Sequence, residues 1–229
     1  MLTILIGRAK TGKSDTMLRR MAELGESSQQ ILLVPEHASH QAEVDVCRAC
    51  GDTASRHAEV LSFRRLGERV LSITGGIADV TLDNGGKLLT LQRALLETAP
   101  QMTVYRKPSQ KVGFLEQMLA LFDELRSYEV TPEILYQQAQ DIDGATHDKL
   151  TDLSLLYAAY EARLRRPGLD ARDRMTKLCD HLEESGYVRD KDIFIDGFTY
   201  FNAQERRALA IFLRQARSVT VTLLGEVNS

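Results

Sequence analysis

The chain has 229 residues, 43% of them hydrophobic, which is enough for one large domain or two small ones with a sizeable core. The formal net charge is −3, which excludes a globally basic nucleic-acid coat protein but not a locally basic groove. No apolar run reaches 18 residues, no cleavable signal pattern opens the chain, and the three cysteines are an odd number. We therefore expect a cytoplasmic protein with no membrane span and no disulfide scaffold.

Strand and helix signals alternate in the first block of the chain. Short apolar runs predict strands at Leu2–Ile6, Ile31–Val34 and Val60–Ser62. Apolar residues at helical spacing predict helices over 13–24, 41–50 and 63–73. The last block repeats this order, with strands at Ile193–Asp196 and Val219–Leu224 around a helix over Gln204–Gln215. Strands separated by helices predict a mostly parallel sheet covered on both faces.

The middle of the chain shows helical stripes with few strand signals. Four amphipathic stripes run through Leu88–Leu95, Leu115–Leu125, Leu153–Leu164 and Met175–Leu182. We therefore predict an α/β fold, a P-loop NTPase (RecA-like) parallel sheet with a helical insertion subdomain. The predicted core is discontinuous, residues 1–81 and 188–229, and the predicted insertion covers 82–187.

The strongest motif is the run Gly7-Arg8-Ala9-Lys10-Thr11-Gly12-Lys13-Ser14, which fits G-x-x-x-x-G-K-[ST] completely between a predicted strand and a predicted helix. The two glycines let the backbone bend around a phosphate chain, so that N–H groups and the helix N-terminus face the anion. Lys13 can then reach the β- and γ-phosphates, and Ser14 can supply a hydroxyl ligand to Mg²⁺. The sequence therefore predicts a site for ATP and Mg²⁺.

A second acid is needed for the metal at the end of a neighbouring strand, and Asp196 has that position. Hydrolytic P-loop motors commonly place a glutamate next, but here the following residue is Gly197, so a general base is missing from the expected place. We therefore expect weak or absent hydrolysis and leave the catalytic residue unassigned. Gln204, in the next predicted helix, is included among the nucleotide-binding candidates.

Several short motifs resemble superfamily I helicases of the UvrD/Rep type. Their D-E-F-Q-D-T-N motif stands against Asp196–Asn202, with Gly197 and Thr199 in place of Glu and Gln. Their T-F-H-S-L-x-x-R-I-L segment is similar to Ser62–Leu71, whereas their DNA-contacting T-F-T-N-K-A-A run matches Pro35–Gln41 poorly. Their next motif opens with Gly-Asp, against Gly225-Glu226 at the end of this chain.

The pattern of kept and lost motifs resembles the N-terminal region of the B subunit (AddB/RexB type) of the bacterial ATP-dependent helicase–nuclease that resects double-strand DNA breaks. Four motifs recur in that subunit: Leu-Val-Pro-Glu/Asp, Ser-Phe-x-Arg-Leu, Thr-Gly-Gly and Val/Ile-Asp-Gly-Phe. They stand here as Leu33–Glu36, Ser62–Leu66, Thr74–Gly76 and Ile195–Phe198.

That resemblance implies a helicase-like module that does not drive unwinding by itself and that partners a helicase–nuclease A subunit. It also implies binding of DNA, whose 3′ strand the subunit helps to scan for the recombination signal Chi. A nuclease domain with a cysteine-ligated iron–sulfur cluster is implied only for a missing C-terminal region. We accordingly expect residues 1–229 to be the first part of a longer protein.

Weaker candidates remain beside the phosphate motif. Arg64, Arg65 and Arg69 share one polar helix face and could contact DNA phosphates, although such faces are usually only solvated. Tyr200 and Phe201 could stack on a base, although buried packing is the more frequent role. Cys47-x-x-Cys50 lacks the second ligand pair that a metal site needs. Two other functions stay open: a stand-alone P-loop kinase or phosphotransferase, and an inert scaffold with a relic P-loop.

Overall fold

The computed structural model describes residues 1–75, 82–106, 112–166, 169–170 and 173–225. Two residues of the helicase-like motifs, Gly76 and Glu226, lie outside these ranges. The described chain divides into two compact units, one formed by residues 1–77 with 174–229 and the other by residues 78–173. Each unit is considered separately below.

The first unit is an α/β unit built on one five-stranded sheet. Its strands pair in the order β1-β7-β6-β2-β3, and every neighbouring pair is parallel. The strands are β1 (Leu2–Gly7), β2 (Gln30–Leu33), β3 (Ala58–Leu61), β6 (Asp192–Ile195) and β7 (Ser218–Leu224). This arrangement confirms the predicted RecA-like α/β sheet, because the helices between the strands supply the crossovers that parallel pairing requires.

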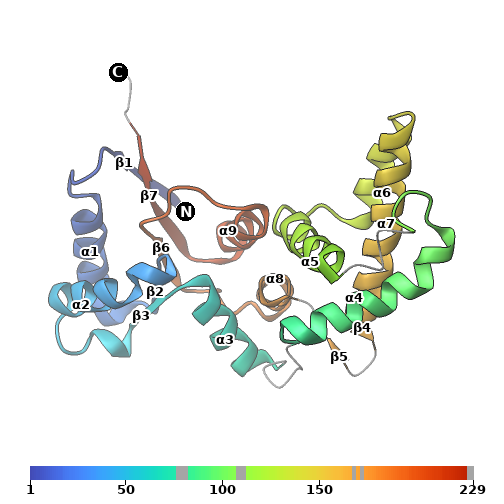
Figure 1. The fold of residues 1–229 in the computed structure, drawn as a ribbon. Helices are drawn as coiled ribbons and strands as arrows, with labels where there is room; N and C mark the ends of the chain where they lie inside the picture. The colour runs from blue at the N-terminus through green and yellow to red at the C-terminus, as the bar shows by residue number, and fades with distance from the viewer. Residues whose placement is uncertain (76–81, 107–111, 167–168, 171–172, 226–229) are drawn as a thin grey trace. The chain divides into compact units, whose positions relative to one another are not determined.

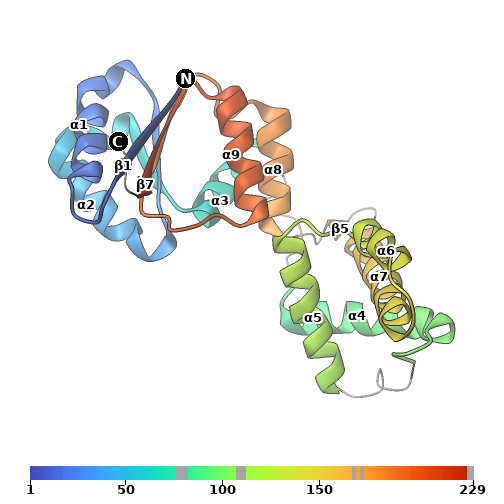
Figure 2. The same ribbon diagram turned by 90° about the horizontal axis from the view of Figure 1, so that it is seen from above.

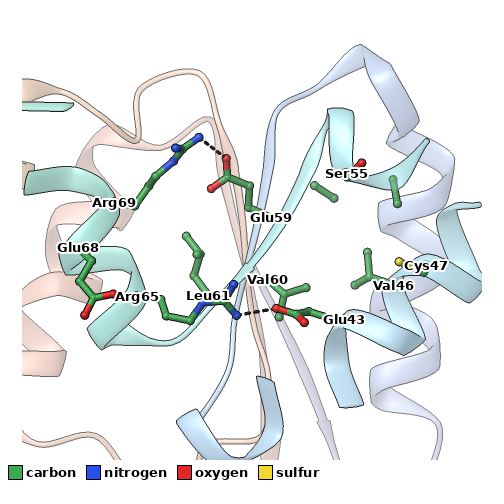
Figure 3. Close-up of a pocket in the computed structure, with 12 residues that line it drawn as sticks. Glu43, Val46, Cys47, Ser55, Glu59, Val60, Leu61, Arg65, Glu68 and Arg69 are labelled. Atoms are coloured by element: carbon green, nitrogen blue, oxygen red, sulfur yellow. Dashed lines mark hydrogen bonds and ion pairs between the residues drawn. The ribbon is translucent and has the colours of Figure 1, made fainter. Parts of the chain in front are cut away.

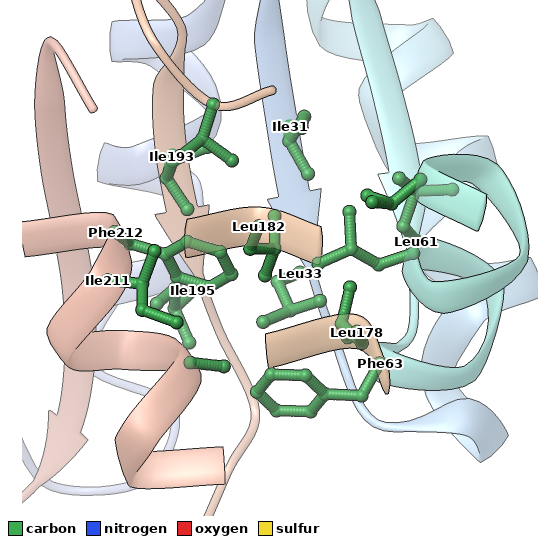
Figure 4. Packing of buried hydrophobic residues seen from close by; sticks show 14 of the residues in the cluster. Ile31, Leu33, Leu61, Phe63, Leu178, Leu182, Ile193, Ile195, Ile211 and Phe212 are labelled. Atoms are coloured by element: carbon green, nitrogen blue, oxygen red, sulfur yellow. The ribbon is translucent and has the colours of Figure 1, made fainter. Parts of the chain in front are cut away.

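Helices cover both faces of that sheet (Figures 1 and 2). One face carries α1 (Lys13–Leu24) and α2 (Ser39–Cys50); the other carries α3 (Phe63–Thr74), α8 (Arg174–Ser185) and α9 (Ala203–Gln215). On the second face, Ile31, Leu33 and Ile195 of the sheet pack against side chains of α8 and α9 (Figure 4). Both faces being buried explains why the central strands read as continuous apolar runs.

The second unit is helical and has its own core. It contains α4 (Asn84–Thr98), α5 (Val112–Ser127), α6 (Pro132–Gln140), α7 (Ala145–Leu164) and a two-residue strand pair, β4 (Arg165–Arg166) with β5 (Leu169–Asp170). Four single 3₁₀ turns, Gly25–Ser27, Glu36–Ala38, Ala54–Arg56 and Ala99–Gln101, complete the described elements. Phe122 lies at the centre of the helical core, stacked on Tyr157 and Tyr160 at centroid distances of 4.6 and 5.9 Å.

The division of the chain differs from the predicted boundaries of 82 and 187. The stripe Met175–Leu182 lies on α8, whose Leu178 and Leu182 are fully buried in the core of the α/β unit. An amphipathic helix has the same sequence pattern whichever unit it packs against, so the pattern could not assign α8. The predicted strand over Val60–Ser62 is also one residue too long, because Ser62 instead caps α3 by accepting a hydrogen bond from the N–H of Arg65.

Candidate nucleotide-binding site

The Gly7–Ser14 loop joins the end of β1 to the start of α1, as the motif predicts. Lys10 and Gly12 both have left-handed backbone conformations, with φ of 60° and 80°. Gly12 immediately precedes α1, where it serves as the N-cap and needs that conformation to turn the chain into the helix. Glycine takes this conformation without the steric cost that a Cβ adds, which is the physical reason for the second glycine of the motif.

The first glycine of the motif is required by close packing within the loop. A Cβ added to Gly7 would lie 2.6 Å from the hydroxyl oxygen of Thr11. That hydroxyl is fixed, because it donates a hydrogen bond of 2.8 Å to the carbonyl oxygen of Arg8. The loop therefore curls tightly enough that only glycine fits at residue 7, the shape expected of a cradle for an anion.

Lys13 lies over the curled loop. Its ammonium donates hydrogen bonds of 2.8 and 2.6 Å to the carbonyl oxygens of Gly7 and Arg8. The positive charge is thus held beside the loop backbone at the N-terminus of a 12-residue helix, where the helix dipole also favours an anion. The glycine cradle, the lysine and the helix N-terminus together fit a phosphate chain, and the exposed Ser14 opens the same helix with a hydroxyl that can ligate Mg²⁺.

Asp196 follows β6, two strands away from the loop. Because β1, β7 and β6 are parallel neighbours, their carboxyl ends meet at one edge of the sheet, and β1 and β6 are about 10 Å apart. The backbone N–H of Asp196 donates to the carbonyl oxygen of Leu33 at 3.0 Å. Its carboxylate accepts a hydrogen bond from the hydroxyl of Thr222 on the intervening strand β7. The sheet thus brings Asp196 to the edge that carries Lys13 and Ser14.

Gly197 occupies the place of the helicase glutamate, and its geometry explains the residue. Its φ is 79°, and an added Cβ would lie 3.3 Å from Cδ of Pro35. A side chain at this position would be strained in the backbone and crowded by Pro35. The turn after β6 is therefore built for glycine, and no acid follows Asp196 directly.

Gln204 is not brought to the Gly7–Ser14 loop. It lies in the first turn of α9, is 7% exposed, and donates from its amide to the hydroxyl of Thr176 on α8 at 3.1 Å. The helices α8 and α9 cover the face of the sheet opposite to α1. This side chain packs two helices together, and its assignment to the nucleotide stays a prediction.

The three arginines of α3 each pair with glutamates. Arg64 pairs with Glu36 and Glu68, Arg65 pairs with Glu43 at 2.6 Å, and Arg69 pairs with Glu59 at 3.0 Å. The last two pairs line a pocket of about 580 Å³ between α2, β3 and α3 (Figure 3). All of these side chains are substantially exposed, so each pair contributes little and can be exchanged for another anion.

A second feature was not predicted: a crevice of about 500 Å³ at the carboxyl ends of β2, β3 and β6. Phe63, Phe198 and the 78% exposed Tyr200 line it beside Glu36 and Arg64. Hydrogen bonds from Arg64 and then from Ser62 lower the pKa of Glu36. The signal in the sequence was the place of Pro35–His37 directly after a strand, because open α/β sheets bind ligands beyond the carboxyl ends of their strands.

The other sequence-level candidates have simpler surroundings. All three cysteines are free thiols: Cys47 is exposed, Cys50 is half-buried and Cys179 is buried. Among the described ranges, no group of three or more His, Cys, Asp or Glu is placed to hold a metal ion. No helix in the same ranges is long and apolar enough to cross a membrane.

The fold and the loop at its edge define the class: a RecA-like α/β unit that carries a phosphate-loop sequence, with a helical unit inserted in its chain. Residues 4–229 match the family model described as ADDB, N-terminal, and the chain belongs to that family.

The curated relatives share one name, which describes the B subunit of an ATP-dependent helicase/deoxyribonuclease. The relative from Desulforamulus reducens is 37% identical over 231 residues, which cover 97% of this chain and 20% of the relative. The relative from Clostridioides difficile is 30% identical over 235 residues, covering 99% of this chain and again 20% of the relative. This chain thus spans about a fifth of the length of the relatives it matches.

Proposed function

We propose that the chain is the ATP-binding, helicase-like N-terminal module of the B subunit of a cytoplasmic ATP-dependent helicase–nuclease that resects double-strand DNA breaks for homologous recombination. Family membership and the relatives' names support the complex. The observation that carries the nucleotide is the Gly7–Ser14 loop, whose glycine cradle and folded-back lysine lie at the N-terminus of α1.

In this proposal the loop binds the phosphates of ATP through backbone N–H groups and through Lys13. Ser14 and Asp196 hold the Mg²⁺ ion, which screens the phosphate charge when it is bound. Gly197 leaves the position after Asp196 without a general base, so the module binds ATP and hydrolyses it slowly or not at all. The nucleotide then acts as a ligand that stabilises the folded state by mass action.

The DNA and the partner protein enter the proposal through different features. The crevice offers aromatic rings on which bases stack, and the neighbouring arginines of α3 offer charge to the phosphates. The A subunit is proposed as the partner because the relatives are named as the B subunit of their enzyme. A kinase and an inert scaffold remain the contrary outcomes of the experiment that follows.

Equilibrium binding of a fluorescent ATP analogue in the presence of Mg²⁺ tests the proposal. Binding should be saturable, and Lys13→Ala should weaken it at least about tenfold, because the substitution removes a charge-assisted contact worth about 1.5–3 kcal/mol. The exposed Lys149 of α7 supplies the control variant, Lys149→Ala, which should bind as the wild type does. Absence of saturable binding identifies a relic loop, and ATP-dependent phosphorylation of a small-molecule acceptor identifies a kinase.

A further inference from the structure

Thr222 lies at the centre of the strand that separates the phosphate loop from Asp196. In the register of the sheet, it pairs with Leu5 of β1 on one side. Ile195 pairs with Val221 on the other side, so Asp196 lies beside Thr222 at the next step of the ladder. Thr222 is therefore one strand away from both halves of the proposed nucleotide site.

The side chain of Thr222 is on the same face of the sheet as α1. Leu5, its partner in the register, packs against the core between the sheet and α1. Phe194, two residues before Asp196, belongs to the same core, and side chains two apart along a strand share a face. The hydroxyl of Thr222 and the carboxylate of Asp196 thus both face the side from which the loop and Ser14 approach.

The hydrogen bond between these two side chains is buried and specific. Thr222 is 5% exposed, and its hydroxyl donates to Oδ1 of Asp196. No other side chain among the described residues bonds the Asp196 carboxylate, so its second oxygen is left for another ligand. A hydroxyl has only one proton, and donating it to Oδ1 fixes the carboxylate in one orientation.

We propose that Thr222 is a positioning residue that orients the Asp196 carboxylate toward Mg²⁺ in the nucleotide site; this inference rests on the function proposed above. The hydroxyl does not touch the metal. It acts through Asp196, as the hydrogen-bonded partners of metal ligands generally do, and removal of such a partner weakens metal affinity by about 10–100-fold.

The same strand provides a matched control. Thr220 is two residues before Thr222, faces the same side of the sheet and is fully buried. Its hydroxyl has no hydrogen-bond partner among the described residues. Thr220→Val and Thr222→Val therefore make the same chemical change in the same strand, but only the second removes a bond to Asp196.

The test measures the Mg²⁺ concentration that half-saturates binding of a fluorescent ATP analogue to the full 229-residue chain. Thr222→Val should raise that concentration at least about tenfold and leave binding in EDTA unchanged. Thr222→Ser, which keeps the hydroxyl, and Thr220→Val should both behave as the wild type does. An unchanged Mg²⁺ requirement in Thr222→Val would overturn the inference while the nucleotide site stands.

Two further outcomes are decisive as well. If the wild type binds no analogue at any Mg²⁺ concentration, the proposed function fails, and the role of Thr222 fails with it. If Thr222→Val does not fold, Thr222→Ala gives the second measurement, with folding checked by circular dichroism. A folded Thr222→Ala with the wild-type Mg²⁺ requirement contradicts the inference, and a raised requirement supports it.

Discussion

Gly197 shows at the scale of one residue why this loop differs from that of a motor. We expect Gly197→Glu to add an acid at the helicase position without producing ATP hydrolysis. The residue would have to hold a φ of 79° with its Cβ beside Pro35, at a cost of about 1–2 kcal/mol for the backbone alone. Urea unfolding measures this loss, and a phosphate-release assay measures the hydrolysis.

The control for that variant is Gly113→Ala in α5. Gly113 is exposed, lies within a helix, and has open space around an added Cβ. Alanine there should leave the free energy of unfolding unchanged or raise it by up to about 1 kcal/mol. Robust ATP turnover by Gly197→Glu would show that the missing glutamate alone limits hydrolysis.

Asp192 gives the molecule a defined acid sensitivity. Burial raises the pKa of Asp192, but hydrogen bonds from Arg217, Ser218 and Ser28 outweigh burial and leave the pKa below its ordinary value. Since the folded pKa is lowered, the stabilisation is present above the unfolded pKa of about 3.9 and is lost as the pH falls through the folded value.

We expect Asp192→Asn to lower the free energy of unfolding at pH 7 by about 1–3 kcal/mol and to remove part of the decline in stability below about pH 4. Chemical denaturation between pH 3 and pH 7 is the measurement. Asp15, an exposed acid in the first turn of α1, gives the comparison variant Asp15→Asn. Parallel pH profiles for Asp192→Asn and the wild type would show that this carboxylate does not set the acid sensitivity.

Helix α3 carries the clearest prediction at the scale of elements. Replacing Arg64, Arg65 and Arg69 together by Gln should weaken binding of a single-stranded oligonucleotide and reduce the slope of log K against log salt by about 2. The present glutamate partners are exposed and contribute about 0–1 kcal/mol each, so DNA phosphates can replace them.

Fluorescence anisotropy over a series of salt concentrations measures that slope. The control is Arg214→Gln, because Arg214 is an exposed arginine of α9 that pairs with Glu183. An unchanged slope in the triple variant, with the control also unchanged, would mean that α3 does not contact the phosphate backbone.

The elements of the α/β unit could be predicted because their signals are local. Apolar runs between helical segments identified all five strands of the sheet, and the glycine spacing identified the loop after β1. The helix α6 was missed, although Thr131 caps it and Pro132 opens it, because its nine residues show a short apolar stripe. The bond from Thr222 to Asp196 could not be foreseen, since it depends on which strands become neighbours.

At the scale of the whole molecule, each of the two units has its own hydrophobic core. We expect calorimetry to resolve two unfolding transitions, of which Mg²⁺ and a non-hydrolysable ATP analogue raise only that of the α/β unit. At an analogue concentration 100 times its Kd the shift should be about 5–10 °C.

A substitution in the helical unit should affect the other transition alone. Asp152 is buried there and accepts hydrogen bonds from the backbone N–H groups of Thr103, Val104 and Tyr105, so Asp152→Asn should lower the stability of this unit by about 1–3 kcal/mol. If both the ligand and the substitution move a single common transition, the two units unfold as one.

The most direct test of nucleotide binding without turnover is to identify the nucleotide that the protein retains. The chain is incubated with ATP and Mg²⁺, separated rapidly from free nucleotide, and its bound nucleotide is analysed by chromatography. We predict intact ATP bound in a saturable manner, abolished by Lys13→Ala. Recovery of no nucleotide, or of ADP that accumulates over many turnovers, would contradict a module that binds ATP without consuming it.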